Sequence, residues 1–562
     1  MTPTTKNIEK LRIIPLGGLE EVGRNMTLFE YLDDIIIVDM GLQFPEEDTP
    51  GIDYIIPNTS YLKDKKDKIK GVIITHGHYD HIGAIPHSMA RIGNPTIYTA
   101  ALTRGIILKR QEDFPRAPKL DIQEIKINDR IELGCFKIEF FHVNHNIPDS
   151  MGLAIETPVG TVIHTGDFKF DHSPINEKPA DLGKITQLGE KGVLVLMSDS
   201  TDSEKPGHSL SENEIQKTLE EIFKGLKGRI IAATFASLLT RVQEIIWLAE
   251  KFDRHVVIEG YSMKANVAIA TELGYLKIQK HTLISSKQAN ALPDNKVLII
   301  CTGAQGEGNA VLMRLATGEH RQLKLHPGDS IIFSSSVVPG NERTVQSLRD
   351  TLCRKGAKII HYEMLDVHTG GHAPIEDLKM MINLVKPKFF IPIEGNYYML
   401  KLHGEIAESV GIPQQNIILG NNGDVILLDK ESIEISEKEK VPAGYVTVDG
   451  LGVGDVGQVV LRDRQAMAKD GMFVIITVID SKTGKIIGQP DIISRGFIYL
   501  RESKELLNQT RKKIQEIIIK TSSSEHTSNS KYIKDNIRDK IGQLLYTKTQ
   551  RRPMVLPVII KV

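Results

Sequence analysis

Residues 71–81 read GVIITHGHYDH and join a short apolar run to four side chains of the types that bind metal ions. The β-branched residues of the run predict a buried strand. The ligand-type residues that follow it are His76, His78, Asp80 and His81. Residues two apart in an extended loop point the same way, so the HGH histidines can bind one cation while the DH pair turns toward a second. The spacing therefore predicts a site for two metal ions.

Further candidate ligands follow other strand-like runs along the chain. His145 comes directly after FKIEFFHVN, and Asp167 comes directly after GTVIHTG, where its carboxylate can bridge two cations. Asp39 near the end of IIIVDMG can orient a ligating histidine by accepting a hydrogen bond from it. Each of these residues alone also fits an ordinary turn, but together they suit a centre with two ions.

The length and charge of the chain bound its class without fixing its substrate. A chain of 562 residues is too long for one hydrophobic core and suggests three domains. The formal net charge of −1 argues against a broadly basic surface, but a local basic groove would not show in that sum. Net charge therefore neither supports nor excludes RNA as a substrate.

Cysteine usage and hydropathy predict a cytoplasmic protein with no membrane segment. Cys135, Cys301 and Cys353 are an odd number without metal-ligand spacing, and each lies in or near an apolar stretch. Such thiols are typical of a reducing compartment. The N-terminal MTPTTKNIEK lacks the apolar core of a signal peptide, and no run of about 18 apolar residues is present.

Strand and helix patterns divide the chain into parts. From residue 11 to about 200, short strands alternate with helical segments, and βα units then predict a parallel sheet with crossover helices. The charged stretch DKESIEISEKEKVPAG predicts a linker that ends near Pro442 and Gly444. Beyond it we expect a small α+β domain with strands at 472–480, 496–500 and 554–562.

A glycine pattern in this last part matches the dinucleotide-binding fingerprint GxGxxG. It is formed by Gly452, Gly454 and Gly457. Such a fingerprint should open a helix, but the residues that follow, QVVLRD at 458–463, have a strand-like pattern. We therefore interpret these glycines as turn residues.

The metal-site segments resemble the metallo-β-lactamase fold, a four-layer αββα sandwich. The resemblance is carried by HGHYDH, by His145 in HNIPDS and by Asp167 in HTGDF. This fold is shared by hydrolases of lactams, thioesters and phosphodiesters, so it fixes no substrate. Asp199 in MSDST and His372 in TGGHAP resemble two motifs of the β-CASP group of nucleases within this fold.

The similarity extends over essentially the whole chain to the ribonuclease J family. It is carried by PLGGLEEVGRNM, GLQFPEEDTPGIDYIIPN, ATFAS, CTGAQGEGN, SSSVVPGNE and LVKPKFFIPIEGN. It implies an α/β protein with a metallo-β-lactamase αββα sandwich, an inserted β-CASP parallel-sheet domain and a small α+β C-terminal domain. The expected parts are residues 1–205 and 363–430 for the sandwich, 206–362 for the insert, 431–447 for a linker and 448–562 for the C-terminal domain.

The resemblance also implies an activity. We expect a metal-dependent RNA hydrolase with 5′-to-3′ exonuclease and endonuclease activity, in RNA decay and in rRNA and mRNA processing. Its substrate would be single-stranded RNA with a 5′-monophosphate, and its assembly a homo-oligomer, either dimer or tetramer. Two divalent metal ions per subunit are implied, Zn²⁺ in the first place and Mn²⁺ as the alternative.

Individual residues take roles from the same resemblance. One cation is expected to bind His76, His78, His145 and Asp167, and the other Asp80, His81 and Asp167. The expected catalytic residues are Asp80, His372 and Asp199, with His372 as general acid for the departing 3′ oxygen and Asp199 orienting it. The expected substrate-binding residues are Phe235, Ala236, Ser237, His368, Thr369, Gly370, Gly371 and His372. Ser237 alone also fits an ST-turn or the N-cap of the helix that begins LLTRVQE.

The chain departs from the family pattern at Glu394. The family has PVHGE at this place, with the histidine on the second cation, whereas this chain has PIEGN at 392–396. A carboxylate ligand suits Mn²⁺ or Mg²⁺ better than imidazole does, so the metal preference stays open. Two other functions also stay open: an RNA-binding protein whose second metal site is too weak for turnover, and a small-molecule metallohydrolase. The retained ligands argue against the first, and the βα insert argues against the second.

Overall fold

The computed structural model describes residues 9–45, 49–338, 340–481, 483, 485–498, 503–522 and 530–562. The chain forms two compact units: Met1–Gln43 with Ile56–Tyr445, and Phe44–Ile55 with Val446–Val562. Among the described residues, none of the helices combines the length and the apolar character that crossing a bilayer requires.

The first unit contains an eight-stranded and a six-stranded sheet that pack face to face. The eight-stranded sheet has the order β20-β19-β1-β2-β3-β5-β6-β7. Its strands are β1 (Leu11–Gly17), β2 (Met26–Tyr31), β3 (Asp34–Val38), β5 (Ile69–Ile73), β6 (Ile97–Thr99), β7 (Ile122–Glu124), β19 (Asp424–Leu428) and β20 (Ile433–Lys440). The six-stranded sheet has the order β18-β12-β11-β10-β9-β8. Its strands are β8 (Arg130–Leu133), β9 (Phe136–His142), β10 (Met151–Thr157), β11 (Gly160–His164), β12 (Val195–Asp199) and β18 (Phe389–Ile393).

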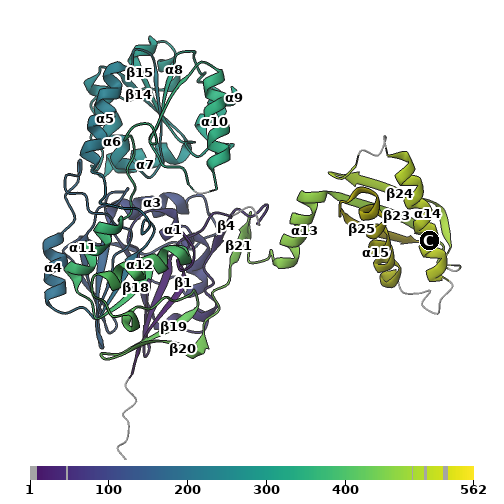
Figure 1. The fold of residues 1–562 in the computed structure, drawn as a ribbon, viewed down its shortest axis with the longest axis horizontal. Helices are drawn as coiled ribbons and strands as arrows, with labels where there is room; N and C mark the ends of the chain where they lie inside the picture. Colours follow the sequence, from purple (N-terminus) through teal and green to yellow (C-terminus); the bar gives the residue numbers. More distant parts are fainter. Residues whose placement is uncertain are drawn as a thin grey trace, which may run out of the picture. The chain divides into compact units, whose positions relative to one another are not determined.

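Alternation of side chains along these strands produces the layers. In β3, Ile36 lies in the core between the two sheets while Ile35 faces the other way, and Phe140 and Phe141 of β9 divide in the same manner. Three helices cover the outer face of the eight-stranded sheet: α1 (Tyr79–Ile82), α2 (Ile85–Ser88) and α3 (Ala101–Gln111). Three more cover the six-stranded sheet: α4 (Leu182–Glu190), α11 (Ile375–Val385) and α12 (Tyr397–Ser409). The predicted αββα sandwich is confirmed (Figure 1).

The predicted inserted domain is also confirmed, as a five-stranded parallel sheet with helices on both faces (Figure 1). Its order is β14-β15-β13-β16-β17, with β13 (Ile230–Ala233), β14 (His255–Glu259), β15 (Val297–Cys301), β16 (Ser330–Phe333) and β17 (Lys358–His361). One face is covered by α5 (Glu212–Gly225), α6 (Leu239–Lys251) and α7 (Tyr261–Glu272). The other is covered by α8 (Ser286–Ala289), α9 (Val311–Thr317) and α10 (Glu342–Arg354). Both faces are buried, which explains the continuous apolar run in β15.

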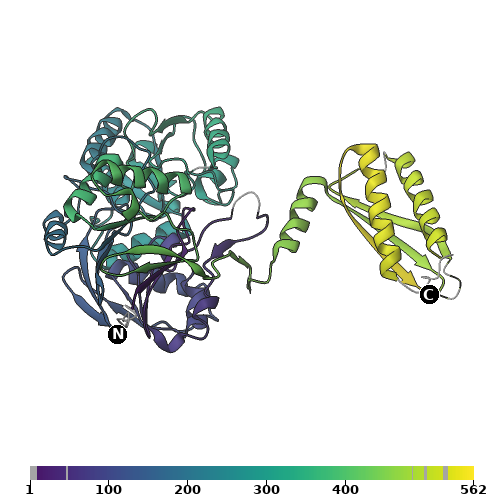
Figure 2. The same ribbon diagram turned by 60° about the horizontal axis from the view of Figure 1, so that its bottom comes forward.

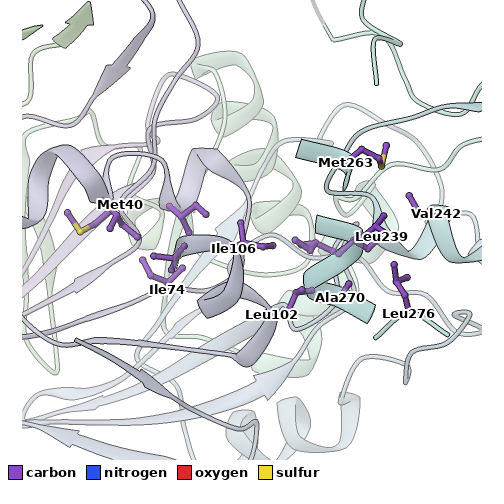
Figure 3. Packing of buried hydrophobic residues seen from close by; sticks show 14 of the residues in the cluster. Met40, Ile74, Leu102, Ile106, Leu239, Val242, Met263, Ala270 and Leu276 are labelled. Atoms are coloured by element: carbon purple, nitrogen blue, oxygen red, sulfur yellow. The ribbon is translucent and has the colours of Figure 1, made fainter. Parts of the chain in front are cut away.

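A single apolar cluster joins the insert to the sandwich. Ile74 and Ile106 of the sandwich belong to the same buried cluster as Leu239 and Met263 of the insert (Figure 3). Helices α3 and α7 approach closely at Gly105, where a Cβ would lie 2.6 Å from Cγ2 of Ile269. The two domains therefore share a core.

The second unit has its own core. A small sheet consists of β4 (Tyr54–Ile56), β21 (Val446–Asp449) and β22 (Gly452–Val453), and α13 (Gln458–Asp470) follows it. A second sheet has the order β24-β23-β25, with β23 (Met472–Ile479), β24 (Ile486–Arg495) and β25 (Met554–Lys561). Helices α14 (Lys504–Ser522) and α15 (Ser530–Thr549) pack on one face of that sheet (Figure 2).

Short 3₁₀ helices among the described residues of the first unit are η1 (Ser60–Leu62), η2 (Lys66–Lys68), η3 (Met89–Ile92), η4 (Asp294–Lys296) and η5 (Gln414–Asn416).

The predicted linker is wrong over Ile433–Lys440, which forms the edge strand β20. It pairs antiparallel with β19, and Ile433 lies opposite Leu428 in the core between the sheets. The charged residues that suggested a linker are typical of an edge strand, because charge there opposes pairing with other chains.

Two strand predictions in the second unit are also wrong. QVVLRD begins α13, where Val459 is 63% exposed and good helix formers follow. In 496–500, the described residues 496–498 lie outside any strand, and 499 and 500 are outside the described residues. Gly496 has a φ of +67°, which turns the chain after β24 and places Phe497 in the core. The strand instead precedes this glycine.

Candidate metal centre

The predicted metal ligands converge from loops at the ends of strands in both sheets. His76 and His78 follow β5, and His145 lies just beyond β9. Asp80 and His81 begin the short helix α1, Asp167 follows β11, and Glu394 follows β18. Their donor atoms form overlapping groups: His76, His78, His145 and Asp167; Asp80, His81 and Asp167; and Asp39, His81 and Glu394. The structure thus brings together all seven predicted ligands.

The first group has the dimensions of a tetrahedral site. Nδ1 of His78 lies 3.1 Å from Nε2 of His76 and 3.0 Å from Nε2 of His145. Oδ2 of Asp167 lies 3.6 Å from each of those two Nε2 atoms. Donors bonded to one zinc ion at ~2.0–2.1 Å in a tetrahedron are separated by ~3.4 Å. These four side chains therefore fit a single cation.

The second group shares Asp167 with the first. Nε2 of His81 lies 3.2 Å from Oδ1 of Asp167 and 3.7 Å from Oδ2 of Asp80. Oδ1 of Asp167 and Oε2 of Glu394 are buried and have no hydrogen-bond partner in the described part of the chain. Leaving buried carboxylate oxygens unpaired is costly, and a divalent cation between them would remove that cost. The residues present therefore fit a second cation, with Asp167 as the bridge.

Asp39 orients two of the histidines. Its Oδ2 accepts a hydrogen bond from Nδ1 of His81 at 2.8 Å, which leaves Nε2 of His81 for the cation. Its carboxylate also accepts from the backbone N–H and the hydroxyl of Thr75, at 2.8 and 2.9 Å. The Thr75 hydroxyl lies 3.1 Å from Nδ1 of His76. Asp39 thus lies where the sequence predicted it, behind the ligands.

Burial and neighbouring charge shift the proton affinities in this cluster. Burial lowers the pKa of His76 and His145 well below the ordinary value, so both rings are neutral, as metal ligands must be. Burial, and after it the charge of Asp167, raises the pKa of Glu394 well above its ordinary value. A cation at the second group would take the place of that proton.

His372 and Asp199 form a pair beside the first group. Nδ1 of His372 donates to Oδ2 of Asp199 at 2.8 Å and lies 3.9 Å from Oδ2 of Asp167. Burial disfavours the charged ring, but the carboxylates of Asp199 and Asp167 outweigh it and raise the pKa of His372 to about 10. The His372 side chain is 23% exposed whereas that of Asp199 is buried. The imidazolium can therefore give a proton from Nε2 to a bound molecule.

The loop that carries His372 also holds a ligand. The carbonyl oxygen of Gly371 accepts from Nδ1 of His145 at 2.6 Å, which directs Nε2 of that ring into the first group. Thr369 donates from its hydroxyl to the carbonyl of Leu210 at 2.9 Å. Burial, and then the charge of Arg241, lowers the pKa of His368 to about 3.

The segment Phe235–Ser237 lies half-buried before α6. The alternative in which Ser237 caps that helix is wrong: the N-cap is Leu238, and no side chain caps it. A hydrogen bond joins this helix to the residue before the His372 loop: Nη1 of Arg241 donates to the carbonyl of Val367 at 2.6 Å. Arg241 is fully buried and also pairs with Glu212 and Glu244.

Gly371→Ala is expected to weaken metal binding at the first group by about 10–100-fold, since it displaces a residue that orients a ligand. A Cβ at this position would lie 2.6 Å from both Nδ2 of Asn146 and Cε1 of His145. Calorimetric titration with Zn²⁺ measures the effect. Gly183→Ala in α4 is the control, because its Cβ would meet only Oδ1 of Asp181, at 3.7 Å. Unchanged zinc affinity in Gly371→Ala would contradict the role given to this loop.

Sequence reasoning missed Asn25 and Arg241. The amide of Asn25 lies 3.1 Å from Nε2 of His81. Asn25 stands in a glycine-rich stretch that resembles a turn, and Arg241 stands in a helix where arginine is ordinarily solvated. No local pattern marks the contact of Asn25 with His81, or those of Arg241 with Glu212 and Val367, because each joins residues distant in the sequence.

Three family models match the chain. The Ribonuclease J β-CASP domain matches residues 227–352, the Ribonuclease J C-terminal domain matches residues 459–562, and the β-lactamase superfamily domain matches residues 50–188.

Several curated proteins are similar over the full length. Ribonuclease J 1 of Streptococcus pyogenes is 40% identical over 560 residues, which cover 100% of this chain and 99% of that protein. Ribonuclease J of Thermus thermophilus is 40% identical over 559 residues, covering 98% of this chain and 96% of that protein. Ribonuclease J2 of Bacillus subtilis is 37% identical over 559 residues, covering 99% and 100%.

A solved structure shares the fold. The crystal structure of a protein of unknown function from Enterococcus faecalis aligns with a TM-score of 0.55 and 20% identity, covering 75% of this chain and 100% of that one. At this level of identity the similarity concerns the fold alone.

Proposed function

The chain belongs to the ribonuclease J family of metal-dependent ribonucleases, and on that premise we propose that it hydrolyses single-stranded RNA as a 5′-to-3′ exonuclease and as an endonuclease. The observation that carries the proposal is the position of Asp167, whose two oxygens face two separate groups of ligands. A carboxylate in this position can hold two cations close enough to act on one phosphodiester.

The residues of the centre divide the reaction between them. The residues of the centre would hold two divalent cations, and these would supply an activated water and neutralise charge on the phosphate oxygens. His372, with Nδ1 held by Asp199, gives its Nε2 proton to the departing 3′ oxygen. Asp80 and His81, which are adjacent at the start of α1, would hold the second cation. The glycines before His372 leave room for a sugar–phosphate backbone.

A 5′-monophosphate is the expected end group. We assign its binding to Phe235, Ala236 and Ser237 and to the loop His368, Thr369, Gly370, Gly371 and His372. Backbone N–H groups in such a glycine-containing loop form an anion-binding concavity. Helix α6 follows the first segment, and Val367 precedes the second. Arg241 of α6 donates a hydrogen bond to the carbonyl of Val367. This contact supports treating the two segments as one binding surface.

The cellular role and assembly follow the same proposal. We assign the protein to RNA decay and to rRNA and mRNA processing in the cytoplasm, as a homo-oligomer, either dimer or tetramer. Cys135, Cys301 and Cys353 are all free thiols, as suits a reducing compartment.

The activity test uses RNA labelled at either end, with a 5′-monophosphate or a 5′-triphosphate. Purified protein is incubated with each RNA under Zn²⁺, under Mn²⁺ and with a chelator. Release of mononucleotides from the monophosphate RNA, lost with the chelator, is the expected result. Tight binding of RNA without cleavage under either metal would instead indicate an RNA-binding protein in which Glu394 makes the second metal site too weak for turnover. Cleavage of a thioester but not of RNA would indicate a small-molecule hydrolase.

Glu394→His is expected to retain RNA cleavage and to raise the preference for Zn²⁺ over Mn²⁺ by about tenfold, because imidazole favours the softer ion. The measurement is the ratio of kcat/KM under the two metals. Glu394→Gln is the matched control, since it keeps the shape of the side chain and removes its charge. It should lower the affinity for both metals. Complete inactivity of the histidine variant, with its fold intact, would count against Glu394 as a ligand.

A further inference from the structure

Asn25 is held rigidly against the second group of ligands. Its N–H donates to the carbonyl of Asp80 at 3.0 Å, and its own carbonyl accepts from the N–H of Gly41 at 2.8 Å. Gly41 allows this contact, because a Cβ there would lie only 1.4 Å from the Asp80 oxygen. The Asn25 side chain is 6% exposed. Its position relative to Asp80 and His81 is therefore fixed by the backbone.

The Asn25 amide lies where a ligand of the second cation should lie. Nδ2 is 3.1 Å from Nε2 of His81, close to the 3.2 Å that separates Oδ1 of Asp167 from the same nitrogen. Because Nδ1 of His81 is bonded to Asp39, Nε2 is the nitrogen that faces the cation. The amide and Asp167 thus stand at equivalent distances from the metal-binding atom of His81.

The other end of the amide has no partner. Oδ1 of Asn25 is buried and makes no hydrogen bond with any described residue. A half-turn about the terminal torsion exchanges the oxygen and the nitrogen at little cost in shape. It would place a carbonyl oxygen, which attracts a cation, where an NH₂ group, which repels one, now faces His81. It would also bring Oδ1, a buried acceptor that lacks a donor, to a position where a cation would satisfy it.

We propose that Asn25 is a further ligand of the second cation, through Oδ1. The inference rests on the proposed two-cation centre. With Asn25 the donor set becomes one imidazole nitrogen and four side chains that offer oxygen: Asp80, Asp167, Glu394 and Asn25. Oxygen-rich sets with a neutral amide carbonyl suit Mn²⁺ or Mg²⁺, which take six ligands, rather than tetrahedral Zn²⁺. The carboxylate of Glu394 and the amide of Asn25 thus favour the same hard cation.

The experiment is calorimetric titration of the full chain with Mn²⁺, together with metal content after dialysis. The wild-type chain is expected to bind two ions. Asn25→Ala should weaken one of them by about 10–100-fold and leave the other unchanged, as expected for the loss of one ligand or its support. Asn25→Asp should bind that ion at least as tightly as the wild type, because a carboxylate replaces the amide oxygen.

Asn422→Ala is the matched control. Its side chain donates to the same 19–25 loop, at the carbonyl of Leu19 and at Oε1 of Glu21, and its hydrogen bonds in the described part of the chain include none to a predicted ligand. It should keep both ions. Equal loss of an ion in Asn422→Ala, or full binding in Asn25→Ala, would overturn the inference while the two-cation centre stands. If Asn25→Ala does not fold, weaker binding in Asn25→Asp would overturn it. Fewer than two ions on the wild-type chain would overturn the proposed centre itself.

Discussion

Asp167→Ala is expected to abolish RNA cleavage, with a fall in kcat/KM of at least about 10³-fold, because two-ion charge stabilisation is worth several kcal/mol. Asp167 lies within 3.6 Å of His76 and His145 and within 3.2 Å of His81, and it contacts both groups of ligands. Its loss removes a ligand from both groups at once. The measurement combines single-turnover cleavage of 5′-monophosphorylated RNA with metal content.

Asp181→Ala is the control for this variant. Asp181 is also an aspartate of the sandwich, but it caps α4 by accepting from the N–H of Lys184 at 2.9 Å, and it belongs to none of the ligand groups found among the described residues. It should cost about 1 kcal/mol of stability and leave cleavage intact. An Asp167→Ala protein that binds two ions and cleaves RNA would refute the bridging assignment.

His372→Ala is expected to slow RNA cleavage by about 10²–10⁴-fold while metal content stays at the wild-type level, as expected for loss of a general acid. The reason is the geometry of the pair: Asp199 holds Nδ1, so the ring has one N–H left to give. A nucleotide 5′-(p-nitrophenyl phosphate) provides the decisive comparison. Its leaving group departs as a stable anion, so the variant should lose far less activity on this ester than on RNA.

Asp199→Asn extends this test to the residue that positions the acid. It keeps the shape of Asp199 but removes the charge that holds His372 protonated. RNA cleavage should fall, again with a smaller effect on the p-nitrophenyl ester. Equal losses on both substrates in His372→Ala would show that His372 acts in binding or folding and not as the acid.

The local part of the centre was accessible from the sequence, because short-range geometry determines it. An apolar β-branched strand followed by HGHYDH leaves few ways to arrange its ligand-type side chains. Ile35, Ile36 and Ile37 are consecutive in β3. Because successive side chains of a strand point to opposite faces, both faces of β3 have to be buried. The position of Glu394 came only from the family resemblance, since nothing near it in the chain marks a ligand.

The failures have a common physical cause, which is tertiary contact. The charged stretch at 433–440 forms an edge strand because it pairs with β19, where Ile433 lies opposite Leu428 and Ile435 opposite Ile426. Val459 lies in a helix although its β propensity is high, because its side chain is 63% exposed and gains no burial that would favour a strand. The role proposed for Asn25 depends on its contact with His81, and no sequence spacing relates these two residues.

The apolar cluster common to the sandwich and the insert also has a consequence for inherited or engineered variation. Since Ile106, Leu239 and Ala270 belong to this one buried cluster (Figure 3), we expect a cavity in it to destabilise both domains. A cavity opened at Leu239 would lower the amount of enzyme in the cell without touching an ion or a nucleotide. Substitutions that reduce the activity in the cell should therefore be found in this apolar cluster as readily as at the residues that bind metal.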